Sequence, residues 1–408
     1  MTILQISIEV NSGSVGRIAE QIGEKVINEN WESYITYARN NRVSTSKTIK
    51  IGTKSDVLWH GVMTRIFDNH AFESKRATRN LLRDIDKINP DIIHLHHLHG
   101  YFINIEILFN YLKNKNIPIV WTFHDCWSYT GHCAYYSYVN CNKWETHCHS
   151  CPQKTEYPKS ILFDRSKKNY TQKKKLFNLV KSTIVPVSHW LGNEVKKSFL
   201  KNQDIRVIQN GIDINIFRPQ ENLDELQDVY NVQDKFVILG VASTWEKRKG
   251  LQEFIKLSKI IPDDVQIILV GISKNQKKEL PSGIIAIERT ENVNQLADLY
   301  SLADVFVNPT LEEALGLTNI EAQACGTPVI TYNSGGSPET VSPATGMVIE
   351  KENTVELLKA IMSVKDKGKN FYSENCRKRA EQFFDKDDRF NDYIELYKEI
   401  LEQSPHTL

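Results

Sequence analysis

A pair of glutamates, one on each side of a glycine, gives this sequence its clearest chemical signal. Glu313 and Glu321 are separated by seven residues, and Gly316 marks the expected start of the helix that carries the second glutamate. A helix start with a glycine presents N–H groups and a positive dipole to an anion such as a phosphate. The two carboxylates can then accept hydrogen bonds from hydroxyls on both sides of that phosphate, as a nucleotide sugar would offer. The alternative is a pair of solvated charges that only complements the helix dipole.

A basic cluster strengthens the anion-site interpretation. Lys247, Arg248 and Lys249 stand directly before Gly250, in the loop after an expected strand at 236–242. This loop is expected at the same end of the sheet as the glutamates. Because lysine and arginine bind phosphate oxygens directly, the cluster can hold a diphosphate without a metal.

Several segments, in a fixed order along almost the whole chain, carry a family resemblance. They are VSHW from Val187, QNGID at 209–213, the glutamate pair, EAQACGTPVI from Glu321, and GGSPE at 335–339. With them the chain resembles glycosyltransferase family 4, and within it the bacterial capsular and exopolysaccharide enzymes of the colanic-acid type. The resemblance implies an α/β GT-B fold, in which two doubly wound, Rossmann-like domains face a cleft. It also implies a retaining transferase that uses a nucleotide-diphosphate sugar.

The resemblance assigns roles to the second half of the chain. The glutamate that matches Glu321 holds the ribose hydroxyls, and the one that matches Glu313 contacts the transferred sugar, which places Glu313 among the expected catalytic residues. The main chain at Gly316, Leu317 and Thr318 meets the phosphates, in agreement with the argument from the helix start.

The basic pair departs from the family pattern, which has an arginine and a lysine with four residues between them. Lys249 matches the lysine, but Thr244 stands at the position of the arginine. Arg248 is expected to supply the second charge, so that Arg248 and Lys249 together bind the donor.

His124 and Asp125 follow an expected strand at 118–123, again at a carboxyl end. His124 matches a histidine that touches the donor sugar in the family, although a lone histidine is more often structural. We expect His124 to position the sugar and Asp125 to orient it or the acceptor, and we count both as catalytic residues. The resemblance implies same-face attack, with the leaving phosphate taking the acceptor proton and no cofactor for the chemistry. Charge stabilisation at the diphosphate then lowers the barrier.

Gly13 and Gly16, in SGSVG, occupy the turn between the first expected strand and the helix after it. Glycine permits close approach of a phosphate or an acceptor, so we place both residues with the donor site. The alternative is a merely tight turn. The segment lacks a GXGXXG fingerprint, which argues against a nicotinamide cofactor.

A cluster of cysteines follows Asp125 in an insert at 126–152. Four thiols in a short segment, ending in the close CHSC pair, are typical of a structural zinc site. The alternatives are buried free thiols or a redox pair. The expected ligands are Cys133, Cys141, Cys148 and Cys151, and the neighbouring imidazoles that could replace one of them belong to His132, His147 and His149.

A second group of metal-binding side chains is the histidine run HLHHLHG, with imidazoles at His94, His96, His97 and His99. Alternation along a strand sends successive side chains to opposite faces. We therefore expect packing and cleft lining from these histidines rather than one common metal.

Short apolar segments alternate with helical ones along the chain, which predicts parallel, doubly wound sheets. We expect an acceptor domain at 1–215, a nucleotide-sugar domain at 216–385, and a tail at 386–408 whose helix crosses back to the first domain. The expected strands of the first domain lie at 1–10, 33–37, 91–95, 118–123, 183–187 and 206–209. Those of the second lie at 236–242, 265–270, 284–287, 304–308 and 328–331.

Charge and hydropathy narrow the classes of partner. With 51 Lys and Arg against 50 Asp and Glu, the net charge is +1, so the chain offers no global field for nucleic acid. Its apolar runs are far shorter than the roughly 18 residues of a membrane span, and its start lacks the features of a signal peptide. We expect a cytoplasmic protein. A basic run could hold it peripherally on anionic lipid or form a solvated helix face; it comprises Lys167, Lys168, Lys173, Lys174 and Lys175.

The sequence as a whole predicts transfer of a sugar to a glycan or a polyprenyl-linked acceptor, in the assembly of a bacterial surface polysaccharide. One alternative is a nucleotide-sugar epimerase of the same GT-B architecture, which would turn over without an acceptor. The other is a zinc-stabilised binding module with an inactive transferase body, which leaves the glutamate pair unexplained.

Overall fold

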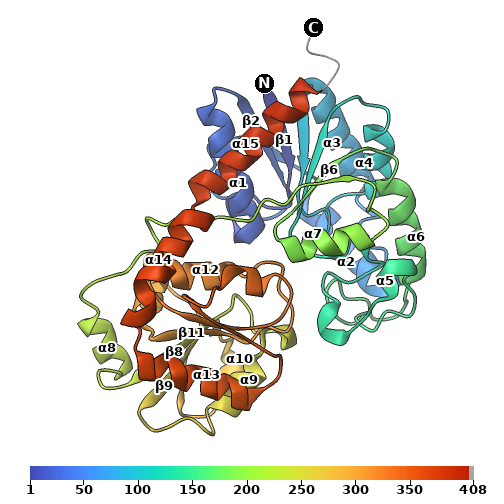
Figure 1. Ribbon diagram of the computed structural model, residues 1–408. Coiled ribbons are helices and arrows are strands. Elements are labelled where there is room, and N and C mark those ends of the chain that lie inside the picture. The colour runs from blue at the N-terminus through green and yellow to red at the C-terminus, as the bar shows by residue number, and fades with distance from the viewer. Residues whose placement is uncertain (404–408) are drawn as a thin grey trace. The chain divides into compact units, whose positions relative to one another are not determined.

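The computed structural model describes residues 1–403, so the expectation for 404–408 lies outside the described residues. The chain divides into two compact units (Figure 1). The first comprises Met1–Gln209 together with the chain from Arg389 onward, and the second comprises Asn210–Asp388. The division falls a few residues before the expected boundary at 215.

A seven-stranded sheet forms the centre of the first unit. Its strands are β1 (Thr2–Ile6), β2 (Glu32–Tyr37), β3 (Lys47–Lys50), β4 (Ile92–Leu95), β5 (Ile119–Phe123), β6 (Thr183–Pro186) and β7 (Asp204–Ile205). They lie in the order β3-β2-β1-β4-β5-β6-β7, and every pairing is parallel. The chain first moves outward from β1 to β3 and then crosses to β4, which makes the sheet doubly wound.

The helices of the first unit connect these strands. They are α1 (Gly13–Asn28), α2 (Lys54–Phe67), α3 (Lys75–Ile88), α4 (Ile105–Leu112), α5 (Lys143–Thr146), α6 (Ser166–Phe177), α7 (His189–Lys197) and the end of α15 (Lys386–Glu402). Thr53 and Asp56 form a capping box that starts α2. Ile22 of α1, Tyr397 of α15 and Ile3 of β1 belong to one buried cluster, which explains why the last helix returns to this unit.

The second unit repeats the arrangement on a six-stranded sheet. Its strands are β8 (Phe236–Val241), β9 (Val265–Val270), β10 (Ile284–Ile287), β11 (Val305–Asn308), β12 (Val329–Tyr332) and β13 (Gly346–Ile349). They lie in the order β10-β9-β8-β11-β12-β13 with parallel pairing throughout. The helices are α8 (Asp224–Tyr230), α9 (Leu251–Leu257), α10 (Lys274–Lys277), α11 (Val293–Leu302), α12 (Leu317–Ala324), α13 (Thr354–Lys367) and α14 (Asn370–Phe384).

The structure differs from the expected strands mainly at the edges of the sheets. Strands β3 and β13 are outermost and were not expected, because their sequences, KTIK and GMVI, are short and lack a long apolar run. The expected strand at 206–209 is wrong, since β7 ends at Ile205. Arg206 N and Ile208 N still donate to main-chain carbonyls at the β6 edge, at 3.0 and 3.3 Å. Within residues 1–403, no helix has the length and apolar character to cross a membrane.

Candidate active site

The basic cluster and Glu313 come together because their strands are neighbours. β8 and β11 pair in parallel, so both end at the same edge of the sheet. Lys247–Lys249 form one 3₁₀ turn in the loop after β8, and Glu313 lies in the segment between β11 and α12. The edge therefore gathers two cations and a carboxylate from segments far apart in the sequence.

Glu313 is the centre of this ion-pair group. Lys249 Nζ donates a hydrogen bond to Glu313 Oε2, and Arg248 Nη1 lies 3.8 Å from the same oxygen. The Glu313 side chain is 16% exposed. Burial alone would raise the pKa of Glu313, but the charges of Lys249 and Arg248 outweigh burial and lower this pKa. The carboxylate is therefore ionised at neutral pH, with two cations held beside it.

Two glycines let the main chain pack closely around the group. Gly250 ends the basic turn with a φ of 78°, and a Cβ there would lie 2.1 Å from the carbonyl oxygen of Pro309. Gly335 has a φ of 56°, and a Cβ there would lie 2.0 Å from the carbonyl oxygen of Glu313. Gly336 N donates to that oxygen at 2.9 Å. The GGSPE segment thus fixes the main chain of Glu313.

The start of α12 offers main-chain donors at the same edge. Gly316, at the N-cap, has a φ of 94°, and the helix begins at Leu317. Because the first N–H groups of a helix have no acceptor within it, the turn from Gly316 to Thr318 can donate to an anion. Asn319 holds this turn, since its Nδ2 donates to the hydroxyl of Ser337 at 3.0 Å. Sequence reasoning missed Asn319, because a buried asparagine gives no signal until its partners are known.

Glu321 lies farther along α12 and is half-buried. The hydroxyl of Tyr300, a buried residue of α11, donates to Glu321 Oε2 at 2.9 Å. This bond fixes the direction of the carboxylate, so that Glu321 can accept hydrogen bonds from a ligand with little loss of side-chain freedom.

In the first unit, histidines after β4 surround Asp125, which follows β5. The two strands pair in parallel and end at the same edge. Asp125 Oδ2 lies 2.8 Å from His99 Nε2 and 3.4 Å from His97 Nε2. Asp125 Oδ1 accepts from Trp127 N at 2.9 Å. Burial alone would raise the pKa of Asp125, but His99 and His97 outweigh it and lower this pKa, so the carboxylate is ionised.

His124 lies next to this group and is half-buried. Its Nε2 is 3.3 Å from His96 Nδ1, and His96 Nε2 is 2.9 Å from Gln5 Oε1. Burial, together with the neighbouring His97 and His96, holds the pKa of His124 well below its usual value. The imidazole is therefore neutral at pH 7, and it can orient a hydroxyl by hydrogen bonding without carrying charge.

The structure brings the second half of the histidine run together with Asp125 and leaves the first half, His94 and His96, outside this group. His97, His99 and Asp125 offer three possible ligand atoms within 4.8 Å of one another, among the residues that the structure describes. His97 and His99 are two residues apart, so alternation also places them on one side. The expectation that the four histidines do not share one metal stays a prediction.

Two family models match most of the chain. The model described as Glycosyltransferase Family 4 matches residues 53–216, and the one described as Glycosyl transferases group 1 matches residues 222–383. The chain belongs to glycosyltransferase family 4. It is a retaining glycosyltransferase that uses a nucleotide sugar, and the family needs no metal for its chemistry. The epimerase and the inactive transferase body find no support in these matches.

Known proteins resemble the glycosyltransferase along nearly its whole length. The putative colanic acid biosynthesis glycosyl transferase WcaC of Escherichia coli (strain K12) is 24% identical over 377 residues, which cover 88% of this chain and 89% of WcaC. Sucrose-phosphate synthase (tll1590) from Thermosynechococcus elongatus aligns with a TM-score of 0.74 and 18% identity, covering 99% and 100% of the two chains. Anabaena Alr3699/HepE in complex with UDP-glucose aligns with a TM-score of 0.66 and 15% identity, covering 98% and 100%. The expected α/β GT-B fold is confirmed.

The first turn of the glycosyltransferase packs against Glu9. A Cβ at Gly13 would lie 2.6 Å from Glu9 Oε2, and a Cβ at Gly16 would lie 3.0 Å from the Glu9 carbonyl oxygen. Gly13 also has a φ of 63°. Close packing within the turn is one reason for both glycines, in line with the tight-turn alternative, and their place in the donor site stays a prediction.

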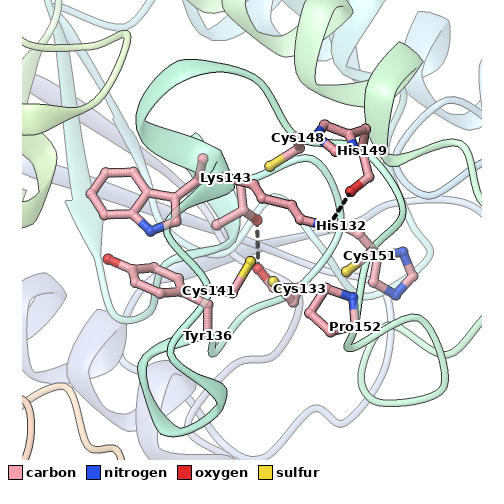
Figure 2. Close-up of a pocket in the computed structure, with 11 residues that line it drawn as sticks. His132, Cys133, Tyr136, Cys141, Lys143, Cys148, His149, Cys151 and Pro152 are labelled. Carbon is pink, nitrogen blue, oxygen red and sulfur yellow. Dashed lines mark hydrogen bonds between the residues drawn. The ribbon is translucent and has the colours of Figure 1, made fainter.

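The cysteine insert of the glycosyltransferase forms an irregular loop around α5. Its cysteines are free thiols. The predicted zinc ligands Cys133, Cys141, Cys148 and Cys151 line one pocket in this loop (Figure 2). Within residues 1–403, no three of their sulfur atoms lie within 4.8 Å of one another.

Proposed function

We propose that this glycosyltransferase moves a sugar from a nucleotide-diphosphate sugar to a glycan or polyprenyl-linked acceptor during the assembly of a bacterial surface polysaccharide. The observation that carries the proposal is the pairing of Lys249 and Arg248 with Glu313 beside the N-terminus of α12. The similarity to a putative colanic acid enzyme supports the pathway. The UDP-glucose complex of a protein with the same fold makes UDP-sugars the first donors to test.

In the proposed donor complex, the diphosphate lies against the main chain at Gly316, Leu317 and Thr318, and Lys249 and Arg248 neutralise its charge. Lys249 then exchanges its contact with the carboxylate for one with a phosphate oxygen. The freed carboxylate of Glu313 can accept a hydrogen bond from the transferred sugar, and Glu321 does the same for the ribose hydroxyls. Gly13 and Gly16 are proposed to let the first turn approach the donor.

The reaction itself needs charge stabilisation more than a protein nucleophile. As the bond between the sugar and the diphosphate breaks, negative charge grows on the leaving phosphate. The two cations and the helix start lie beside this phosphate and stabilise the growing charge. The hydroxyl oxygen of the acceptor attacks the sugar from the face that the diphosphate leaves. A phosphate oxygen takes the proton of that hydroxyl during the attack. His124, being neutral, orients the sugar, and Asp125 orients the sugar or the acceptor through its histidine partners.

The first test is the thermal midpoint of the purified protein against UDP, GDP, ADP and their sugars, because a ligand that binds only the folded state raises the midpoint. One nucleotide family is expected to raise it, and the shift should vanish in Glu321→Ala. The exposed Glu279→Ala, in the same unit, is the matched control and should keep the shift. A panel without any shift would contradict the proposed donor site.

The acceptor side of the proposal includes an apolar patch on the first unit. The patch comprises exposed side chains of α2 and of the segment 161–163: Leu58, Trp59, Val62, Phe67, Ile161, Leu162 and Phe163, which are 37% to 68% exposed. The two segments are tied together, since Ile161 N donates to Arg65 O at 2.7 Å and the rings of Phe67 and Phe163 stack at 5.6 Å. The patch is therefore a continuous surface rather than scattered side chains.

Because cations lie next to the apolar patch, we propose that the patch binds an anionic bilayer. Lys54, Arg65, Lys159, Lys167 and Lys168 are not buried and belong to the same segments or their neighbours. Aromatic and aliphatic side chains flanked by cations are typical of a membrane-surface site. The basic run noted in the sequence contributes less than expected, because one of its members, the lysine at 173, is only 1% exposed.

The double substitution Trp59→Ser and Phe163→Ser is expected to lower binding to phosphatidylglycerol vesicles at least tenfold. The reason is that burying one such side chain is worth roughly 1.5–3 kcal/mol. Cosedimentation measures the binding, and Val229→Ser, at an exposed site of the second unit, is the control. Unchanged binding in the double variant, or equal binding to neutral vesicles, would contradict this surface.

A further inference from the structure

The cysteine loop encloses a pocket of the size of a single ion (Figure 2). Its volume is about 10 Å³, which is on the order of the volume that one water molecule or one ion needs. Cys133, Cys141, Cys148 and Cys151 line it together with His132. Figure 2 shows the four sulfur atoms around the pocket, on side chains that come from different turns of the loop.

The main chain of the loop is shaped around these thiols. Gly131 N donates to Cys148 Sγ at 3.2 Å. A Cβ at Gly131 would lie 2.3 Å from the carbonyl oxygen of Ser166 and 2.7 Å from the Cys148 Cβ. A residue larger than glycine would therefore push Ser166 and Cys148 away from the main chain at position 131. Cys133 is hydrogen-bonded to Cys151. A main-chain N–H directed at sulfur can hydrogen-bond a metal-bound thiolate.

An unpartnered nitrogen also lines the pocket. The side chain of His132 is fully buried, and its Nδ1 lies 2.6 Å from Asp68 Oδ1. Its Nε2 has no hydrogen-bond partner among the described residues. A buried polar atom without a partner needs an explanation, and a carboxylate that holds the other ring nitrogen of a histidine is the usual outer support of a metal site. A filled pocket would give His132 Nε2 a charged neighbour that an empty one lacks.

Two lysines place positive charge next to the thiols. Lys173 Nζ is buried and donates to the carbonyls of Trp127 and Thr130 at 2.7 and 3.1 Å. Lys143 lines the pocket, and its Nζ donates to the carbonyls of the two residues between the last two cysteines, at 3.1 and 3.0 Å. Lys173 Nζ also lies 3.4 Å from the centroid of the Trp127 ring. Burial lowers the pKa of Lys173 to about 7, so negative charge close by would stabilise its ammonium form.

We propose that this loop binds one structural zinc ion through Cys133, Cys141, Cys148 and Cys151. Each thiol loses its proton to solvent as its Zn–S bond forms, so two positive and four negative charges leave a net charge of minus two, which the two lysines balance. The sulfur atoms lie farther apart than a tetrahedral site requires, and binding turns the cysteine side chains into the pocket. Four protein ligands leave no open position, so the ion holds the fold of the loop and takes no part in the transfer.

The zinc site supports the active site through the main chain. The loop begins directly after Asp125, and its Trp127 N donates to Asp125 Oδ1. Lys173 in turn holds the Trp127 carbonyl. Only this consequence rests on the proposed function; metal binding itself is tested without activity.

The direct test is the metal content of the full chain, purified without a chelating tag and measured by plasma mass spectrometry. About one zinc per chain is expected, as for a four-ligand structural site. Cys148→Ser combined with Cys151→Ser should remove it. Cys126→Ser, in the same loop but outside the pocket lining, is the matched control and should retain it. A chain that contains no zinc, or that contains iron instead, would overturn the proposal.

X-ray absorption at the zinc edge of the unmodified protein gives a result even if the double variant fails to fold. Four sulfur neighbours at about 2.3 Å are expected. A shell of nitrogen and oxygen at about 2.0–2.2 Å would instead point to His97, His99 and Asp125, and would overturn the assignment to the thiols. Three sulfurs and one nitrogen would also overturn the four-cysteine site, with His132 as the ligand.

Discussion

Replacing Lys249 with methionine is expected to lower kcat/KM for sugar transfer by about 10²–10³-fold, the usual cost of removing one preorganised partner of a developing negative charge. Lys249 and Arg248 are the cations beside Glu313. In the variant, Arg248, at 3.8 Å, is the cation that remains for the carboxylate and the diphosphate. The loss should fall mainly on kcat, because charge on the leaving phosphate is greatest in the transition state.

The measurement is release of the nucleotide from the donor that raises the thermal midpoint. The exposed Lys259→Met removes the same charge from the same unit and is expected to leave kcat/KM unchanged. If Lys249→Met raised KM without lowering kcat, Lys249 would serve binding alone. If neither constant changed, the diphosphate would lie elsewhere, and the assignment of Arg248 as the substitute for the missing arginine would fall with it.

The donor-site residues of the second unit could be predicted because their sequence motifs and the order of the strands point to the same edge of the sheet. The glutamates, the helix start at Gly316 and the basic turn all follow strands of one parallel sheet, so the sequence order alone brings them to one edge. What the sequence could not predict is how they are held. The close contacts at Gly250 and Gly335 depend on carbonyls from distant segments, and Asn319 is recognised only once its hydroxyl partners are known.

The first unit shows where reasoning from local pattern fails. Alternation separates His97 and His99 from His94 and His96, but it does not show that His97 and His99 meet Asp125, which follows another strand. Which side chains meet at strand ends depends on how the strands pair, and periodicity does not record this pairing. The burial of Lys173 was missed for a related reason, because a lysine in a charged run is read as solvated unless a tertiary acceptor is known.

The neutral state of His124 leads to a second large effect. His124→Ala is expected to lower kcat by about 10²-fold or more, a cost typical of losing one group that orients the reacting centre. His124→Gln should recover part of the activity, since its amide can keep one hydrogen bond to a hydroxyl. The thermal midpoints of both variants show whether any loss comes from unfolding rather than from the missing contact.

The pH dependence of kcat separates the positioning role of His124 from general base catalysis. A histidine with the usual pKa of about 6.5 would titrate between about pH 5.5 and 7.5, and as the base it would make kcat fall as pH decreases through that range. Burial and the neighbouring imidazoles hold the pKa of His124 well below this range, so His124 is already neutral at pH 6 and kcat should show no inflection that the alanine variant removes. An inflection between about pH 5.5 and 7.5 that disappears in His124→Ala would contradict the positioning role and make His124 the proton acceptor. A flat profile with the expected loss of kcat would leave the leaving phosphate as the group that takes the acceptor proton.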